Sequence, residues 1–288
     1  MTYTSLIDTE TLASRLSDPT VAIVDCRFDL KDPAWGEREY AARHVPGAVY
    51  ASLDADMSGE KTGRNGRHPL PDPAALARAF GRLGIDRSTQ VVAYDQDTGI
   101  YASRFWWLLR WLGHDAAAVL DGGFAKWLKE YRPISSGVES RAAGTFAGTP
   151  RPGWVVTVDE VAEASRGAGL PRAESRGSRL VDARAPERFR GENETIDAVG
   201  GHIPGALNHF YKWNLTDENT FRPSSEVRDR LRASIGDVAP ERVINYCGSG
   251  VTACHNLLAF EHAGLRGAKL FAGSWSEWSS DPGRPIET

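Results

Sequence analysis

Short apolar runs alternate with segments of helical spacing along the chain. Apolar residues three and four positions apart predict helices at residues 74–83, 102–112, 227–235 and 252–263. Continuous apolar runs bounded by polar or turn-forming residues indicate buried strands at 21–25, 91–94, 180–182 and 243–246. Strands that alternate with helices predict an α/β fold whose mainly parallel sheets carry helices on both faces. Such sheets form their functional sites at the carboxyl ends of the strands.

The same pattern occurs twice, which indicates a tandem duplication. A His-(Val/Ile)-Pro-Gly-Ala motif begins at His44 and again at His202, 158 positions later. Asp25 and Asp182 end equivalent strands, 157 positions apart. The repeat is too long for a solenoid, so the chain contains two copies of one domain. We place the first copy at residues 1–140 and the second at 155–288, joined by a Gly-, Ser- and Pro-rich linker at about 132–154.

Composition and charge exclude several classes of protein. The 288 residues include 34 Lys and Arg against 38 Asp and Glu, a net charge of −4 without long basic runs, so we expect no nucleic-acid partner. No apolar stretch reaches the roughly 18 residues of a membrane span, and the N-terminus lacks the pattern of a secretory signal. Three cysteines argue against a disulfide framework. These features predict a cytoplasmic protein that does not associate with membranes.

A cysteine loop in the second copy carries the clearest chemical signal. It connects a predicted strand that ends at Tyr246 to a predicted helix, through Cys247, Gly248, Ser249, Gly250, Val251 and Thr252. The two glycines allow a tight curve whose N–H groups turn inward. Those groups and the helix N-terminus favour an anion on sulfur, which makes the thiol a nucleophile. The alternative, a buried cysteine at a strand end, is disfavoured by the Gly-Ser-Gly turn.

These motifs make the sequence resemble the two-domain rhodanese-type sulfurtransferases over essentially its whole length. The loop Cys-Gly-Ser-Gly-Val-Thr is similar to that of the 3-mercaptopyruvate sulfurtransferases in this family. Members that prefer thiosulfate usually carry two basic residues after the cysteine, where this chain has Gly248 and Ser249. Cations at those positions suit a doubly charged donor. The resemblance therefore implies tandem rhodanese-like domains that take sulfur from 3-mercaptopyruvate, a small anionic donor, hold it as a persulfide on Cys247 and release pyruvate.

The resemblance also implies the partners of the loop. Gly248, Gly250, Val251 and Thr252 would contact the donor, and the sulfur would pass to cyanide or to a thiol such as thioredoxin or a small dithiol. No metal or organic cofactor would be required. The spacing of Cys247, Cys254 and His255 is not that of zinc ligands.

The first copy differs from the second at the position of the loop cysteine. It has Asp95 where the second copy has Cys247. Because a carboxylate cannot carry sulfane sulfur, we expect the first copy to be catalytically silent.

Family members handle protons with a Ser of the loop, a His and an Asp. The matching positions here are Ser249, His68 and Asp56, with Asp54 as the alternative to Asp56. When sulfur leaves mercaptopyruvate, the carbon fragment departs as an enolate that needs a proton. The three residues would either deliver that proton or deprotonate the substrate thiol.

Arg190 matches a family arginine that binds the substrate carboxylate, a planar group suited to a guanidinium. The mercaptopyruvate enzymes usually place a second arginine a few residues later. Residues 192–197 of this chain contain three acids and no arginine. Either another cation substitutes, Arg104 being one candidate, or the donor is not mercaptopyruvate.

Three other functions are weighed against this hypothesis. A thiosulfate:cyanide sulfurtransferase differs from it only in the donor. A non-catalytic persulfide carrier or redox sensor would need only the thiol. A cysteine-dependent phosphatase is disfavoured, because its chemistry uses an arginine six residues after the cysteine and this chain has Ala253 there.

Overall fold

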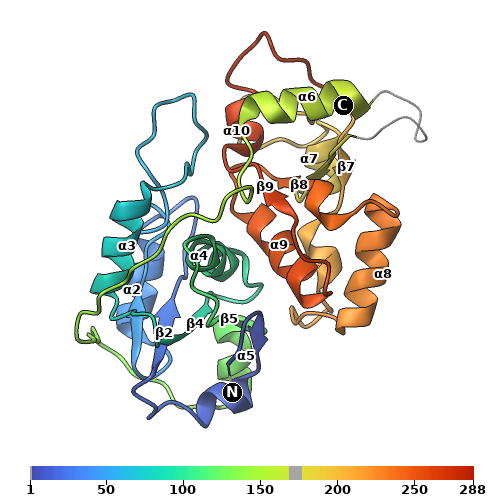
Figure 1. The fold of residues 1–288 in the computed structure, drawn as a ribbon. Helices are drawn as coiled ribbons and strands as arrows, with labels where there is room; N and C mark the ends of the chain where they lie inside the picture. Colours follow the sequence, from blue (N-terminus) through green and yellow to red (C-terminus); the bar gives the residue numbers. More distant parts are fainter. Residues whose placement is uncertain (1, 169–176) are drawn as a thin grey trace. The chain divides into compact units, whose positions relative to one another are not determined.

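The chain forms two compact units in the computed structural model, which describes residues 2–168 and 177–288 (Figure 1). The first unit contains residues 1–59, 71–151 and 217–220, and the second contains residues 60–70, 152–216 and 221–288. The change of unit between residues 151 and 152 falls inside the linker expected at 132–154. A short segment of the first copy, residues 60–70, belongs to the second unit. The sequence contains no signal that assigns it there.

The first unit contains a five-stranded sheet in the order β1-β5-β4-β2-β3, with every neighbouring pair parallel. Its strands are β1 (Leu6–Ile7), β2 (Val21–Asp25), β3 (Ala48–Tyr50), β4 (Gln90–Tyr94) and β5 (Ala117–Leu120). Its helices are α1 (Thr9–Ala13), α2 (Trp35–Ala42), α3 (Pro73–Arg82), α4 (Ile100–Trp111) and α5 (Gly123–Lys129). Helix α3 begins where a sequence rule expects it, because Asp72 caps the N–H of Ala75 and Pro73 occupies the first turn.

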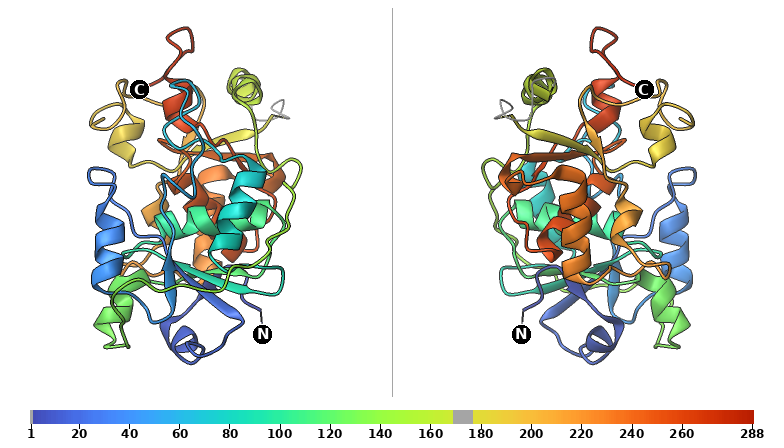
Figure 2. Two further views of the ribbon diagram at one scale, coloured as in Figure 1. Left: turned by 90° about the vertical axis from the view of Figure 1, so that its left-hand side faces the viewer. Right: turned by 90° about the vertical axis from the view of Figure 1, so that its right-hand side faces the viewer.

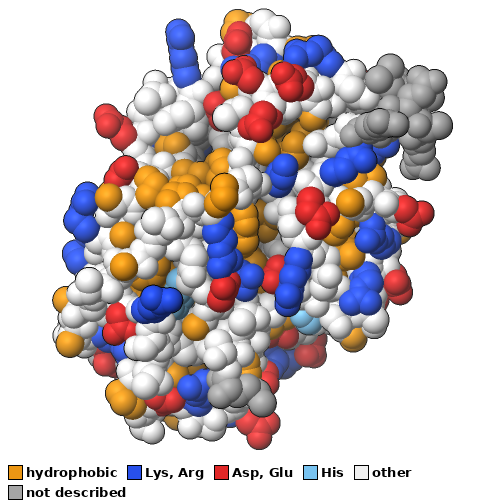
Figure 3. Space-filling view, in the orientation of Figure 1, with side chains coloured by type: hydrophobic (Ala, Val, Ile, Leu, Met, Phe, Trp, Pro, Cys, Tyr) orange, Lys and Arg blue, Asp and Glu red, His pale blue; other side chains and the backbone are white. Residues whose placement is uncertain are grey.

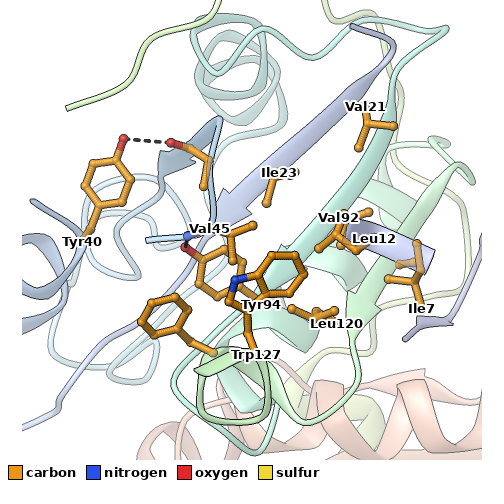
Figure 4. Packing of buried hydrophobic residues seen from close by; sticks show 13 residues of the cluster. Ile7, Leu12, Val21, Ile23, Tyr40, Val45, Val92, Tyr94, Leu120 and Trp127 are labelled. Atoms are coloured by element: carbon orange, nitrogen blue, oxygen red, sulfur yellow. Dashed lines mark hydrogen bonds between the residues drawn. The ribbon is translucent and has the colours of Figure 1, made fainter. Parts of the chain in front are cut away.

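The core of the first unit forms where strand residues meet helix residues. Ile23 of β2 and Val92 of β4 pack with Leu12 of α1 and Trp127 of α5 (Figure 4). Tyr94 brings a hydroxyl group into this core, and the hydroxyl accepts a hydrogen bond from the N–H of Val45 at 3.2 Å. Burial of these side chains removes apolar surface from water, which is the main force that holds the sheet against its helices.

In the described part of the second unit, residues form a four-stranded parallel sheet in the order β7-β6-β8-β9. Its strands are β6 (Arg179–Asp182), β7 (Leu207–Asn208), β8 (Val243–Tyr246) and β9 (Lys269–Leu270). Its helices are α6 (Val158–Ala168), α7 (Pro186–Phe189), η1 (Tyr211–Asn214), α8 (Ser224–Ile235), η2 (Pro240–Arg242), α9 (Thr252–His262) and α10 (Ser274–Trp278). Helices α8 and α9 pack side by side, and α9 also packs on β8 and β9 (Figures 1 and 2). Val161 of α6 and Trp275 of α10 pack with Ile244 and Tyr246 of β8.

The predicted α/β fold with parallel sheets is confirmed in both units. The four predicted strands lie within one residue of β2, β4, β6 and β8, and the four predicted helices correspond to α3, α4, α8 and α9. Of the five additional strands in the described residues, β1, β3, β7 and β9 have only two or three residues each and β5 has four. Segments this short carry no periodicity, so only pairing with a longer neighbour defines them as strands.

The duplication extends to the details of each sheet. Arg27 forms hydrogen bonds with both carboxylate oxygens of Asp25, and Arg184 does the same with Asp182, with a shortest distance of 2.7 Å in each pair. Both pairs are buried. This ion pair is therefore a shared structural feature of the two copies, since it occurs whether or not the copy contains a cysteine loop.

Two surface properties agree with the composition. Lys and Arg side chains are interspersed with Asp and Glu over the face seen in Figure 3. Within residues 2–168 and 177–288, no helix combines the length and the apolar character needed to cross a membrane.

Candidate active site

Cys247 directly follows the last residue of β8, and the loop that it opens leads into α9. Its side chain is buried, with 2% of the residue exposed. The N–H of Gly250 donates a hydrogen bond to the Cys247 sulfur, with a nitrogen–sulfur distance of 3.1 Å. A loop amide aimed at sulfur stabilises a thiolate, and so does the N-terminus of the following helix.

The loop is held in its curve by Ala272 and by the first two residues of α10. The N–H of Cys247 donates to Ser274 Oγ at 3.1 Å, and the Cys247 carbonyl accepts from the N–H of Trp275 at 2.9 Å. Gly250 has φ +79°, and a Cβ atom there would lie 2.3 Å from the carbonyl oxygen of Ala272. The second glycine of the loop is thus required both by its backbone conformation and by a close backbone approach. Ser274 itself has φ +56°, an uncommon value for a residue with a side chain.

His68 and Ser249 meet beside this loop, as the sequence predicted. His68 Nδ1 lies 2.8 Å from Ser249 Oγ, and both side chains are buried. Gly66 brings the His68 segment close to the start of α10: it has φ +84°, and a Cβ there would lie 2.6 Å from the carbonyl oxygen of Gly273. The main chain is also tied down, because the N–H of Arg67 donates to Ser276 Oγ at 3.1 Å.

A chain of alternating charges runs past the cysteine loop. Glu194 links the buried Asp182–Arg184 pair to Arg188, with hydrogen bonds of 3.4 Å to Arg184 and 2.9 Å to Arg188. Arg188 Nη2 then donates to Asp197 Oδ2 at 3.0 Å, and Asp197 also pairs with Arg67. The six side chains, in spatial order, are Asp182, Arg184, Glu194, Arg188, Asp197 and Arg67. Three cations and three anions therefore alternate.

The last three side chains in this row of charges lie next to Gly248, the residue that follows Cys247. A Cβ atom on Gly248 would lie 2.9 Å from Arg67 Nη2, 3.4 Å from Arg188 Nη2 and 3.6 Å from Asp197 Oδ2. Burial lowers the pKa of the Arg67 guanidinium, while its interaction with Cys247 acts in the opposite direction. Arg67 therefore belongs to the electrostatic surroundings of the thiol.

The corresponding loop of the first unit contains its own anion. The Asp95 carboxylate accepts hydrogen bonds from the N–H groups of Gly99 and Tyr101, at 2.9 and 2.8 Å. Complete burial raises the pKa of Asp95 to about 6, against the opposing effect of these hydrogen bonds. In the Asp95 loop, backbone N–H groups therefore point at a carboxylate. In the Cys247 loop, a backbone N–H group points at sulfur.

The remaining predicted residues lie in varied surroundings. Val251 is the N-cap residue of α9 and Thr252 its first residue. Arg190 is 48% exposed and pairs with the exposed Glu192. In the first unit, the Asp56 carboxylate accepts from the N–H of Ser52 and pairs with Arg82, and Arg104 is buried and donates to the carbonyl of Met57. The functions predicted for these residues stay predictions.

Sequence reasoning missed four residues that contact the loop or its charge chain. They are Arg67, Arg188, Asp197 and Ser274. Arg188 belongs to the same Arg-Phe-Arg-Gly motif as Arg190, the arginine that the resemblance selected for the substrate carboxylate. The one feature of the sequence that could have pointed to Arg67 is its position immediately before His68. Within the part of the chain that the structure describes, no group of three or more His, Cys, Asp or Glu side chains has the arrangement of a metal site.

Comparison with known proteins agrees with this geometry. The family model of the rhodanese-like domain matches residues 8–130 and 161–281. A Pseudomonas aeruginosa protein named as a probable 3-mercaptopyruvate sulfurtransferase is 43% identical over 290 residues, which cover 100% of this chain and 99% of that protein. A Mycobacterium tuberculosis protein, provisionally named as a thiosulfate sulfurtransferase, is 39% identical over 93% of this chain and 91% of its own length. The structure of 3-mercaptopyruvate sulfurtransferase from Leishmania major superimposes with a TM-score of 0.78 at 30% identity, over 96% of this chain and 74% of that one.

Proposed function

The chain belongs to the rhodanese-like family and is a sulfurtransferase, and from that premise we propose that it moves sulfur from 3-mercaptopyruvate through a persulfide on Cys247. The single observation that carries the choice of donor is the His68–Ser249 pair, 2.8 Å apart beside the loop. A donor with a carbon leaving group requires a proton, whereas sulfite, the leaving group of thiosulfate, does not. A built proton-handling pair therefore favours mercaptopyruvate.

The first half-reaction forms one bond and breaks one bond. The Cys247 thiolate attacks the sulfur of mercaptopyruvate, so a sulfur–sulfur bond forms while the carbon–sulfur bond breaks. The electron pair of the broken bond stays with carbon, as the enolate of pyruvate. The Gly250 N–H that lies 3.1 Å from Cys247 Sγ stabilises the anionic sulfur before the attack.

His68 and Ser249 complete this half-reaction. The enolate takes a proton through the Ser249 hydroxyl, which His68 replenishes, and leaves as pyruvate. In the second half-reaction a thiolate or cyanide attacks the outer sulfur of the persulfide. The sulfur–sulfur bond then breaks, and its electrons return to Cys247 as the thiolate.

We assign the substrate carboxylate to Arg188 rather than to Arg190. Both arginines are paired with carboxylates, Arg188 with Glu194 and Asp197 and Arg190 with Glu192. What distinguishes Arg188 is its position, because its Nη2 lies beside Gly248, the neighbour of the nucleophile. A guanidinium binds a carboxylate through two parallel hydrogen bonds. With its carboxylate at Arg188, the donor would have its sulfur end close to the thiol.

We propose that the enzyme acts in a reducing compartment, the cytoplasm. Cys26, Cys247 and Cys254 are thiols in the structure. Their persistence as thiols, including the nucleophile, is expected where thiols are kept reduced. Fractionation of cells that produce the protein checks this assignment.

Steady-state kinetics on the full chain tests the proposal. We expect kcat/KM for 3-mercaptopyruvate to exceed that for thiosulfate by about tenfold or more, or about 1.4 kcal/mol, with cyanide as the common acceptor. Cys247→Ser should abolish both activities. Loss of turnover in this variant with a preference for mercaptopyruvate supports the mechanism and the donor together.

Thiosulfate is the second candidate donor, because two guanidinium groups lie beside Gly248. A preference for thiosulfate would contradict the proposed donor and keep the persulfide mechanism. Absence of Cys247-dependent turnover with either donor would contradict both, and would favour a persulfide carrier or redox sensor.

A further inference from the structure

Ser276, in the first turn of α10, forms one hydrogen bond with the cysteine loop and one with the segment that carries His68. Its N–H donates to the carbonyl of Gly248 at 2.9 Å, and its Oγ accepts from the N–H of Arg67 at 3.1 Å. Gly248 directly precedes Ser249 in the sequence. Arg67 directly precedes His68 in the same way. One residue therefore ties together the two backbone segments that carry the histidine and serine of the proton-handling pair.

The Ser276 hydroxyl is oriented for this contact. Its Oγ donates a proton to the carbonyl of Gly273 at 3.1 Å, so it acts as an acceptor toward the Arg67 N–H. The two backbones also approach closely, because a Cβ atom on Gly66 would lie 2.6 Å from the Gly273 carbonyl oxygen. The segment that carries His68 therefore meets the start of α10 at two successive residues.

The first copy has the same backbone bond without the hydroxyl. Ala125 of α5 occupies the position of Ser276, and its N–H donates to the carbonyl of Gln96 at 2.9 Å. Gln96 corresponds to Gly248 in the alignment of the two copies. The bond from the N–H is thus part of the shared fold. The hydroxyl, in contrast, is added in the copy that contains the thiol.

This anchoring matters because chain connectivity does not hold the pair together. His68 Nδ1 and Ser249 Oγ come from positions 181 residues apart. Residues 60–64 of the segment are all exposed, whereas His68 is buried, so burial begins only where the segment reaches α10. Proton transfer depends on the distance and alignment of the hydrogen-bonded groups. Displacement of the Arg67 backbone would therefore weaken it.

We propose that Ser276 is a positioning residue for proton transfer, whose hydroxyl holds the Arg67 backbone so that His68 reaches Ser249. This inference rests on the proposed function. Ser276 itself touches neither the donor nor the sulfur in this role. It acts through the two segments that it joins, and its loss should affect the donor that requires a proton more than the donor that does not.

Ser276→Ala tests the hydroxyl, because it gives this position the side chain that the first copy already has. The backbone bond to Gly248 is retained, so we expect the variant to fold. Its kcat with mercaptopyruvate should fall about tenfold, a part of the roughly 100-fold contribution of a general acid. Its kcat with thiosulfate should stay within about twofold of the wild-type value, because sulfite leaves without a proton. Equal losses with both donors would overturn the inference, since they would indicate a general disturbance of the cysteine loop.

Ser279→Ala is the matched control. It removes a hydroxyl from the C-cap of the same helix, where Ser279 Oγ donates to the carbonyl of Trp275 at 2.8 Å. Both kcat values should stay within about twofold of the wild type. If this variant lost as much mercaptopyruvate turnover as Ser276→Ala, the effect would belong to the stability of α10 and the inference would fail.

A double variant shows whether Ser276 acts through His68. In the His68→Asn background, Ser276→Ala should lower kcat with mercaptopyruvate by less than about twofold more, because no imidazole remains to be positioned. A further loss of about tenfold would overturn the inference, since the hydroxyl would then act by another route.

The chemical reactivity of His68 gives a readout that needs no sulfur transfer. Diethyl pyrocarbonate acylates accessible imidazole rings, and only 4% of His68 is exposed. Mass spectrometry of the peptide that contains His68 should show modification at least about threefold faster in Ser276→Ala, through local opening, and an unchanged rate in Ser279→Ala. An unchanged rate in Ser276→Ala overturns the positioning role. A raised rate in an enzyme that does not use mercaptopyruvate supports that role and contradicts the proposed donor alone.

Discussion

His68 Nδ1 lies 2.8 Å from Ser249 Oγ, although the two residues are 181 positions apart in the chain. Both belong to the second unit, because the segment at residues 60–70 packs there. Ser249 is a member of the cysteine loop, so this hydrogen bond connects a proton-carrying group to the position where the donor would react. If this hydrogen bond only stabilised the loop, its loss would slow the reaction equally with every donor. If it serves proton transfer, its loss should slow the reaction with mercaptopyruvate more than the reaction with thiosulfate.

His68→Asn should slow turnover with mercaptopyruvate far more than turnover with thiosulfate. We expect kcat with mercaptopyruvate to fall about 100-fold, the usual contribution of a general acid, because the enolate must take a proton. Thiosulfate releases sulfite, which leaves without one. Parallel kcat measurements on both donors check this prediction. Equal losses with the two donors would contradict a role in proton transfer.

Asp197→Asn should shift the donor preference toward thiosulfate. The six-charge chain contains three cations and three anions, so the variant leaves one positive charge in excess. A dianion gains more from that charge than a monoanion does, and the gain should shrink as salt screens it. We expect the ratio of kcat/KM for thiosulfate to that for mercaptopyruvate to rise about fivefold at low salt, or about 1 kcal/mol.

Glu192→Gln is the matched control for this experiment. It also neutralises a carboxylate of the 192–197 stretch, but this side chain is 55% exposed and pairs with Arg190. Its donor ratio should stay within about twofold of the wild type. A comparable shift in both variants would mean that overall charge, and not the position of Asp197, determines the preference.

Gly250→Ala should destabilise the protein by about 2–4 kcal/mol. The residue has φ +79°, and the new Cβ would meet the Ala272 carbonyl oxygen at 2.3 Å. The expected cost adds about 1 kcal/mol for the left-handed backbone to about 1–3 kcal/mol for the steric clash. Denaturant unfolding of the full chain measures it.

Gly153→Ala isolates the backbone part of that cost, and the difference between the two variants gives the steric part. Gly153 has φ +75° and no atom within 4 Å of the added Cβ. This variant should lose only about 1 kcal/mol. If the two variants were equally destabilised, the close approach of the loop to Ala272 would not be what requires a glycine at position 250.

Asp95→Asn should alter the pH dependence of stability between about pH 4 and pH 7. Burial raises the pKa of Asp95 from 3.8 to about 6, so in this range the folded state binds more protons than the unfolded state. The contribution of Asp95 to stability is therefore complete below pH 3.8 and is lost as the pH rises through about 6. The wild type should lose about 3 kcal/mol relative to the variant over this window. Denaturant titrations of both proteins at several pH values measure the difference, and parallel curves would contradict the prediction.

Local patterns were sufficient to predict β2, β4, β6, β8 and the helices α3, α4, α8 and α9, and to single out the cysteine loop, whereas α2 and the 11-residue α6 were not predicted. The strand β8 and the helix α9 follow directly from apolar runs and spacing, and the Gly-Ser-Gly turn between them identifies Cys247. Asp95 at the equivalent position of the first copy was likewise evident from alignment of the two halves. Apolar runs, helical spacing and turn motifs each depend on residues that are close together in the sequence, so they can be read from the sequence directly.

The choice between Arg188 and Arg190 shows where local patterns end. Helix α7 covers residues 186–189 and Arg190 is its C-cap, so the two arginines lie two positions apart on a helical turn. Two positions on a helix rotate a side chain by about 200°, which directs the two guanidiniums to nearly opposite sides. Arg188 meets Glu194 and Asp197, and Arg190 meets Glu192 near solvent. Only the path of the backbone decides which of them contacts the loop.

The sequence alone therefore determined the fold class, the duplication and the position of the cysteine loop, and the family resemblance supplied Ser249 and His68 as candidate partners. The tertiary structure decided which distant side chains surround that loop. It placed residues 60–70 in the second unit, which brings Arg67 to Gly248 and pairs it with Asp197, 130 positions away. The physical reason is that propensity and periodicity act over a few residues. The pairing of charges depends on distances in space, which the packing of the whole unit sets.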